Sequence, residues 1–376
     1  MTKFASLILI FVFSVFAVNM NAEIKNENKP LKGEWDFQPQ PVWEVESAGD
    51  DVLSEARAIH PDDNGNVFLF EGKHRKFFAF APDGKFLYSF GKTGEGPGEY
   101  KLVFDFFLVG NYVIAPDQGK IHYFTRKGEF VKSANPGVLF FPRLFIDENR
   151  FITVDEVNEK KKQYEKLEIY DLDRKSRSAL TEITAEKSLT ASAESEGRQM
   201  TLVIKIGDIT PVVVITLHQN LLYYGKNDNY LVKKIDLNGK ELLAFSLQGR
   251  KQKEITREYK KKRIDQIKLN GGAIPADMAK QMIDGMPDYA PYFNRITIEE
   301  NGLIYVFMND PANETGLEID IFSPEGKYLY HGRLTLPGGL IKAGGLEIKG
   351  NFLWAFTEDN DGERKLVKYK IVKPSI

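Results

Sequence analysis

The fold is decided by the segment Phe77-Phe78-Ala79-Phe80-Ala81-Pro82-Asp83-Gly84-Lys85-Phe86-Leu87-Tyr88-Ser89-Phe90-Gly91. Two runs in it, Phe77–Phe80 and Phe86–Phe90, are apolar and aromatic, which is the composition of β-strands. Between them, Pro82-Asp83-Gly84-Lys85 combines a proline, an aspartate and a glycine, the residue types that tight turns use. The segment therefore predicts two strands joined by a tight turn.

Turns of two kinds return along the chain and separate its apolar runs. The first kind contains a glycine between two strands and occurs at Pro82–Lys85, Arg126–Glu129, Leu237–Lys240 and Pro324–Lys327, with Asp171–Arg174 as a version that lacks the glycine. The second kind precedes an alternating apolar strand and occurs at Asn64–Asn66, Gly110-Asn111, Glu148–Arg150, Gln219-Asn220, Asn301-Gly302 and Gly350-Asn351. Two turn types in fixed order, at a period of roughly 40–50 residues, indicate the four-stranded blades of a β-propeller.

Six copies of this pattern predict an all-β fold, a six-bladed β-propeller over residues 42–373. The expected blades cover approximately residues 52–90, 100–135, 140–180, 205–248, 292–336 and 340–373. The last blade contains three clear strands, whereas the alternating run Trp43-Glu44-Val45-Glu46 belongs to no other blade. We therefore expect residues 42–47 to complete the sixth blade, because this pairing closes the ring and removes exposed strand edges.

Two segments interrupt the period. Residues 175–205 are polar and charged, and we expect them to extend the connection between blades three and four. Residues 251–290 predict a short helical insert between blades four and five, with a second short helix that begins at Pro275. The insert is expected to act either as a cap on one rim or as a lid or partner-docking element over the central opening.

The N-terminus has the order of a secretory signal. Met1-Thr2-Lys3 is followed by the apolar run Phe4–Val18, and Asn19-Met20-Asn21-Ala22 supplies a small residue for cleavage. We expect a signal peptide at residues 1–22, an N-terminal extension at residues 23–41 and no membrane span after cleavage. The chain has no cysteine, which excludes disulfides, thiolate metal sites and lipid attachment through a cysteine. The sequence thus predicts a periplasmic or secreted protein.

Several stretches resemble a known superfamily. Phe68–Gly91 resembles an NHL repeat, and Asp117–Gly128 is similar to the same consensus. Gly94-Glu95-Gly96-Pro97-Gly98-Glu99-Tyr100 resembles the glycine-rich signature of exported bacterial six-bladed β-propeller proteins of the NHL-repeat and TolB-like superfamily, and Tyr289–Phe293 also looks like that family. The resemblance covers most of the mature chain, and it implies a fold; most members have no assigned activity.

The glycine-rich stretch invites a phosphate-binding interpretation, which its spacing excludes. A P-loop needs a glycine five residues before Gly91, where Phe86 stands, and it needs a helix afterwards, where Leu102–Val109 has strand composition. A dinucleotide fingerprint fails as well, because proline removes an amide donor. The structural signature loop, made of Gly94, Gly96, Pro97, Gly98 and Glu99, is therefore expected to join blades one and two, with Glu99 bonding neighbouring backbone amides.

The candidate ligand-binding residues are charged side chains that precede or begin the innermost strands. They are Arg57, Asp105, Arg143 and Arg295. Innermost strands line the channel of a propeller, so these charges can converge at its mouth and hold an anionic group or a peptide terminus. The alternative is that they form ion pairs between neighbouring blades.

The function favoured by the sequence is a non-enzymatic binding module, exported and monomeric, for a peptide, protein or carbohydrate of the cell envelope. The formal net charge of −2 offers no basis for a nucleic-acid partner. The five histidines show no metal-ligand spacing, and no catalytic motif, metal site or cofactor is expected. The alternative is a metal-dependent enzyme similar to propeller lactonases and lyases; it leaves open a divalent cation in the channel near carboxylates such as Asp105 and Asp155.

Overall fold

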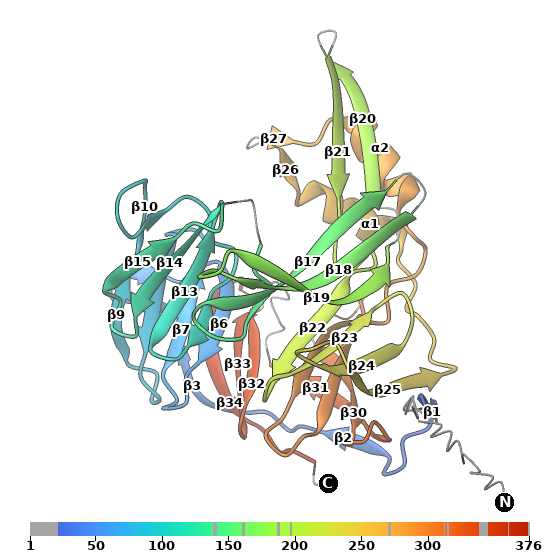
Figure 1. The fold of residues 1–376 in the computed structure, drawn as a ribbon. Helices are drawn as coiled ribbons and strands as arrows, with labels where there is room; N and C mark the ends of the chain where they lie inside the picture. The colour runs from blue at the N-terminus through green and yellow to red at the C-terminus, as the bar shows by residue number, and fades with distance from the viewer. Residues whose placement is uncertain are drawn as a thin grey trace, which may run out of the picture.

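Six sheets stand around a common axis (Figure 1). The computed structural model describes residues 22–137, 141–159, 162–185, 189–195, 198–269, 272–311, 313, 316–337, 345–359 and 361–374. In these ranges each of the six sheets has four or five strands, which follow one another in chain order from the axis outward except that β1, β2 and β3 from the N-terminus are the outermost strands of three blades. The all-β, six-bladed β-propeller predicted from the turns is confirmed.

The first three blades each contain four antiparallel strands. Blade one consists of β6 (Ala56–Pro61), β7 (Val67–Glu71), β8 (Lys76–Phe80) and β9 (Phe86–Phe90). Blade two consists of β12 (Phe107–Val109), β13 (Tyr112–Asp117), β14 (Lys120–Thr125) and β15 (Phe130–Ala134). Blade three consists of β16 (Leu144–Phe145), β17 (Arg150–Glu159), β18 (Lys162–Asp171) and β19 (Ser176–Thr184).

The last three blades recruit a strand from the N-terminus in addition to their own strands. Blade four consists of β22 (Val213–His218), β23 (Leu221–Lys226), β24 (Leu231–Asp236) and β25 (Glu241–Gln248). Blade five consists of β28 (Phe293–Ile298), β29 (Ile304–Met308), β30 (Gly316–Phe322) and β31 (Tyr328–Thr335). Blade six has only β32 (Leu346–Lys349), β33 (Phe352–Glu358) and β34 (Arg364–Lys370) of its own.

The middle strands of the blades are buried on both faces, because each blade is packed between two neighbours. Every residue of β7 and of β29 is buried, which explains why β29 and β7 up to Phe70 are continuous apolar runs rather than alternating ones. The buried side chains form clusters between successive blades. Between blades one and two, for example, Phe77 packs edge-on against Tyr100, with ring centroids 5.7 Å apart.

Residues 24–45, here called the N-terminal strap, run along the outer edges of three blades. β1 (Ile24–Glu27) pairs in parallel with β25 of blade four, and β2 (Glu34–Asp36) pairs in parallel with β31 of blade five. β3 (Gln40–Val45) then pairs antiparallel with β34 and completes blade six. The predicted closure of the sixth blade by residues 42–47 is confirmed. The segment 23–41, expected only as an extension, instead adds a fifth strand to two blades.

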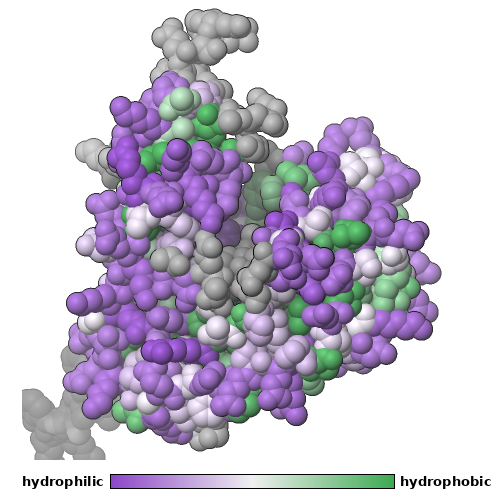
Figure 2. All heavy atoms as spheres, turned by 180° about the vertical axis from the view of Figure 1, so that it is seen from behind, coloured by the Kyte–Doolittle hydropathy of each residue, from purple (hydrophilic) through white to green (hydrophobic). Residues whose placement is uncertain are grey.

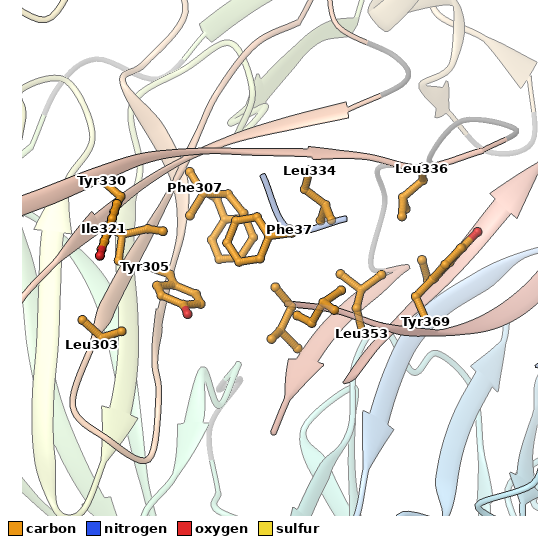
Figure 3. Close-up of a cluster of buried hydrophobic side chains, with 14 of the residues drawn as sticks. Phe37, Leu303, Tyr305, Phe307, Ile321, Tyr330, Leu334, Leu336, Leu353 and Tyr369 are labelled. Atoms are coloured by element: carbon orange, nitrogen blue, oxygen red, sulfur yellow. The ribbon is translucent and has the colours of Figure 1, made fainter. Parts of the chain in front are cut away.

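Phe37 attaches the N-terminal strap to the body of the propeller. Its side chain is fully buried in the cluster between blades five and six, against Tyr305 at a centroid distance of 5.9 Å (Figure 3). Its backbone carbonyl accepts from Val372 N at 2.8 Å, and Trp35 Nε1 donates to the carbonyl of the same Val372 at 3.1 Å. The two ends of the chain are therefore joined by hydrogen bonds as well as by packing.

The helical insert lies between blades four and five, as predicted. It contains α1 (Arg257–Asp265), β26 (Lys268–Leu269), β27 (Gly272–Ala273) and α2 (Ala276–Gly285). The Thr256 side chain caps α1 by accepting from Tyr259 N at 3.2 Å.

The structure corrects the prediction that residues 175–205 only extend the connection between blades three and four. Residues 176–184 form β19, the outer strand of blade three, and a hairpin of β20 (Leu189–Ser195) and β21 (Arg198–Ile204) follows. The hairpin packs on α2, where Ser192 and Gln281 exchange two hydrogen bonds of 2.9 and 3.1 Å. Hairpin and insert together form a module with its own buried core, which rises beside the ring (Figure 1).

Two further pairs of short strands complete the description. β4 (Ser47–Ala48) pairs with β5 (Asp51–Val52), and β10 (Lys92–Thr93) pairs in parallel with β11 (Glu99–Tyr100). The predicted signal peptide lies outside the described residues except for Ala22. Neither α1 nor α2, the helices of the described part, has the length and apolarity to cross a membrane.

Replacing Phe37 by alanine tests the anchoring of the N-terminal strap. The F37A substitution removes a fully buried ring between two blades, so we expect the free energy of unfolding to fall by about 3–5 kcal/mol. Leu31→Ala is the matched control on the same strap, because Leu31 is 70% exposed and its loss should change stability by less than about 0.5 kcal/mol. Urea denaturation of both variants measures the difference. Equal effects would show that the strap does not hold the ring.

Candidate functional site

A cavity of about 1100 Å³ runs along the axis of the propeller. Its lining comes from all six blades, chiefly from the innermost strands β6, β12, β16, β22, β28 and β32. Inner strands of successive blades run in the same direction, so their first residues meet at one end of the channel, here called the entry end. The predicted residues Asp105, Arg143 and Arg295 all line this cavity. None of the described residues of the helical insert does, which favours the rim-cap interpretation over a lid.

Arg143 precedes β16 and is held in place by its backbone, where Arg143 N donates to Ile152 O at 2.9 Å. Its side chain is open to solvent through the channel and makes no hydrogen bond or ion pair with any residue that the structure describes. Burial by surrounding protein lowers the pKa of the guanidinium, while the charges of Glu165 and Asp105 act in the opposite direction. The Glu165 carboxylate is itself paired with Lys205 Nζ at 2.8 Å.

Asp105, just before β12 of blade two, contacts His60, near the end of β6 of blade one. His60 Nε2 lies 3.0 Å from Asp105 Oδ1, and the same oxygen accepts from Phe106 N at 2.8 Å. The His60 ring stands edge-on to Phe106 at 4.7 Å. Burial lowers the pKa of His60, but the hydrogen bond and the negative charge of Asp105 outweigh it, so that the pKa is raised overall.

Arg295 connects blades five and six. Its guanidinium donates to the Glu347 carboxylate and to the carbonyl of Leu346, and it lies 5.6 Å from the centre of the Phe307 ring. Arg295 and Asp105 thus both form contacts between neighbouring blades, as the structural alternative in the sequence expected.

Arg57, the fourth predicted residue, does not line the channel cavity. Its Nε donates to Glu55 Oε1 at 2.9 Å, and its guanidinium lies 6.0 Å from the centre of the Phe104 ring. Arg57 therefore belongs to the surface around the entry end. Of the four predicted side chains, the fold brings three to the channel and leaves one of these, Arg143, without a partner among the described residues.

Sequence reasoning missed a side pocket of about 410 Å³ that adjoins the channel between blades two and three. It shares Asp105, Phe107 and Arg143 with the channel. Ile215 is shared as well, and the further apolar lining includes Leu102, Phe104, Phe141 and Pro142. The signal that could have found it is the apolar pair Phe141-Pro142 directly before Arg143, outside any strand pattern.

The structural signature loop lies away from the channel and does not line it. Glu99 Oε2 accepts from Gly96 N at 3.0 Å, and Glu99 Oε1 pairs with Lys92 Nζ at 2.7 Å. Gly98 has a φ of +74°, and a Cβ there would come within 2.8 Å of the Phe130 ring. The loop is shaped by its own glycines and by Glu99 to join blades one and two.

The carboxylates considered for a metal site are each engaged elsewhere. Asp105 binds His60, and Asp155 pairs with Arg177 at 2.8 Å. In the described ranges of the chain, no group of three or more His, Cys, Asp or Glu residues has a metal-binding arrangement.

Residues 52–270 match the sequence profile of DUF5128, a family described as a 6-bladed beta-propeller. The chain belongs to this family. No curated protein matches the sequence of this DUF5128 propeller.

Solved structures agree with this assignment at the level of the fold. A Bacteroides fragilis protein described as exported aligns with a TM-score of 0.56 at 14% identity, over 94% of this chain and 100% of that one. A DUF4221 family member from Bacteroides vulgatus aligns with a TM-score of 0.52 at 9% identity, over 90% and 99%. A virginiamycin B lyase from Staphylococcus aureus aligns with a TM-score of only 0.41 at 12% identity, over 89% and 100%, and this similarity supports no statement about fold or reaction.

The pair of His60 and Asp105 predicts a pH dependence of stability. The pKa of His60 is raised above the value of about 6.5 expected in the unfolded chain. Burial and the positive charge of Arg295 lower this pKa, but Asp105 and Glu347 raise it by more. The stabilisation is therefore fully present below the unfolded pKa and is lost as the pH rises through the folded pKa. The His60→Gln substitution should thus reduce the free energy of unfolding more at about pH 5.5 than at about pH 9.

His218→Gln is the matched control with the opposite sign. Burial lowers the pKa of His218 against the charge of Glu300, so the wild-type chain loses stability as the pH falls. Removing this histidine should therefore reduce the loss of folding stability that the wild-type chain shows at acid pH. Urea denaturation at both pH values checks the pair, and a His60 effect that does not change with pH would contradict the assignment.

Proposed function

We propose that this propeller is an exported, non-enzymatic binding module that takes a carboxylate-bearing ligand into its central channel. The observation that carries the proposal is the guanidinium of Arg143, which faces the channel without a hydrogen-bond or ion-pair partner among the described residues. The Arg143 side chain is exposed within the concave channel, so its N–H donors are free to meet a ligand, and a planar carboxylate matches them in a bidentate pair. A carboxylate ligand supplies the partner that the protein lacks.

The other charges at the entry end support this choice of ligand. Asp105 is hydrogen-bonded to His60, and Arg295 is ion-paired with Glu347, so both have partners within the ring. Lys349, also in the channel lining, is paired with Asp63, and Arg126 is bonded to the carbonyl of Gly110, whereas Arg143 has neither kind of partner among the described residues. A peptide, a protein terminus or an acidic carbohydrate of the cell envelope could provide the carboxylate.

Export and wider kinship are parts of the same proposal. The apolar run Phe4–Val18 at the N-terminus supports a signal peptide and a periplasmic or secreted location, and the Bacteroides fragilis neighbour is itself described as exported. The NHL-like stretches around Pro82–Lys85 support kinship with the NHL-repeat and TolB-like superfamily. We expect a monomer.

Replacing Arg143 by alanine tests the proposal. Two probes with a carboxylate, the tripeptide acetyl-Gly-Gly-Phe and galacturonate, are compared by calorimetry with their neutral counterparts, the peptide C-terminal amide and galactose. At least one acid should bind the wild-type chain more tightly than its neutral counterpart, and R143A should weaken it by at least about tenfold, because a charged hydrogen bond is lost. R143K keeps the positive charge but lacks the paired N–H donors of the guanidinium, so its affinity for the acid should lie between those of the wild type and R143A.

The control for Arg143 is Arg174→Ala, since the Arg174 side chain is 82% exposed in an outer turn. It should leave affinity unchanged. EDTA or Ca²⁺ should not alter the binding of either acid. Binding that needs a cation would contradict direct pairing with Arg143 and would favour the metal-dependent enzyme. Affinity that R143A leaves intact would sink the proposal.

Arg295 should behave differently from Arg143. R295A leaves the Glu347 carboxylate and the Leu346 carbonyl without their donor, so we expect the free energy of unfolding to fall by about 1–3 kcal/mol. R143A, which breaks no contact within the described part of the chain, should unfold like the wild type. Thermal and urea denaturation of the two variants measure this contrast, and equal losses would mean that Arg143 has a structural partner.

A further inference from the structure

Arg143 stands where the central channel and the side pocket meet, because it lines both cavities. A ligand group that pairs with its guanidinium therefore lies beside two spaces of different size. The side pocket of about 410 Å³ has room for a large side chain and the backbone that carries it, whereas the channel of about 1100 Å³ can take a longer extended segment.

The side pocket displays aromatic rings that the fold does not cover. Phe104 and Phe141 are 58% and 63% exposed, and among the described residues only one other phenylalanine, Phe130 at 38%, is classed as exposed. Scattered exposed apolar residues are ordinary, but two such rings on one concave surface suit an apolar occupant. The surface seen from behind is mostly hydrophilic, with apolar residues in small separate groups (Figure 2).

The polar groups of the side pocket are mostly occupied by the protein itself. Asp117 accepts from Lys101 N at 2.9 Å and from Leu102 N at 2.8 Å, and Asp105 is bonded to His60. Binding of a sugar depends on several polar side chains that hydrogen-bond to its hydroxyl groups. The pocket therefore favours an apolar group next to a carboxylate over a carbohydrate acid.

We infer that the ligand of the channel is the C-terminus of a polypeptide whose last residue has a large apolar side chain. The terminal carboxylate pairs with the guanidinium of Arg143, and the last side chain enters the side pocket between Phe104 and Phe141. The preceding residues extend into the channel. This inference rests on the proposed function, and it adds the chemical class of the ligand and the residues that select it.

The charge of Arg143 also sets the direction of the peptide. A C-terminal carboxylate is attracted by the guanidinium, while an N-terminal ammonium group is repelled by it. An internal aspartate or glutamate could reach Arg143, but it would not place an apolar side chain on the atom next to the carboxylate. The combination of carboxylate and apolar group on one residue is specific to a C-terminus.

A panel of acetylated tripeptides tests the inference on the mature full-length chain. The probes are acetyl-Gly-Gly-Phe, acetyl-Gly-Gly-Leu, acetyl-Gly-Gly-Lys and acetyl-Gly-Gly-Asp, with the C-terminal amide of the first and galacturonate alongside. By calorimetry, the Phe and Leu peptides should bind at least about tenfold more tightly than the Lys and Asp peptides and the amide, because these lack the apolar side chain or the terminal charge.

Variants of the pocket separate the two parts of the recognition. Phe104→Ala and Phe141→Ala should each weaken the Phe peptide by about three- to tenfold while leaving the weaker Lys peptide unchanged. Arg143→Ala should weaken all the free-acid peptides. Tyr289→Ala is the matched control, since this aromatic side chain is 57% exposed and lines neither cavity, and it should change nothing. Circular dichroism confirms that each variant is folded.

The outcomes distinguish the inference from the proposed function. If all free-acid peptides bind equally and the phenylalanine variants have no effect, the inference is wrong while the binding of carboxylates by Arg143 stands. Preference for galacturonate over every peptide would likewise overturn the peptide assignment alone. If no acid binds, or if R143A changes nothing, both proposals fail.

Discussion

Closure of the ring by the pairing of β3 with β34 is the constraint on which the rest of the structure depends. A propeller has no sheet that continues from one blade to the next, so its ring is held closed by packing between blades and by the hydrogen-bonded overlap of the two ends of the chain. Here Gln40–Val45, from the start of the chain, supplies the outer strand of the last blade. The N-terminal strap reinforces this overlap, because it also pairs with blades four and five and buries Phe37 between blades five and six.

A closed ring fixes where the innermost strands begin, and this position creates the candidate site. Asp105 and Arg295 come from different blades and find partners, His60 and Glu347, on the neighbouring inner strands. Arg143 has no such partner because the inner strand of the next blade, Val213–His218, begins with valines and an isoleucine, and because Glu165 is taken by Lys205. Of these apolar residues Ile215 also lines the side pocket beside Arg143, which supports the proposal that the site takes an amphipathic group.

The module beside the ring, made of the hairpin and the helical insert, could be predicted from the sequence only in part. Both helices of the insert were predicted from their apolar spacing and from Pro275. The hairpin β20–β21 was not, since its sequence is rich in Ser, Thr and Glu and alternates only weakly. Its apolar residues Leu189 and Ala191 are buried only because α2 supplies Met278 and Met282 against them. The face of β20 is buried by a helix some 90 residues later in the chain. The local sequence of such a strand therefore gives little indication that it is a strand.

The sequence by itself determined the number of blades, their order, the closure of blade six by an N-terminal strand and the place of the insert. These features follow from turn chemistry and strand alternation, which act over a few residues and repeat six times. Only the tertiary structure decided which arginine is paired, that Arg57 lies outside the channel, that residues 24–36 add strands to two blades, and that Phe104 and Phe141 form a pocket. These features depend on contacts between segments that are far apart in the sequence and are brought together by the closed ring. A local sequence pattern cannot predict such contacts.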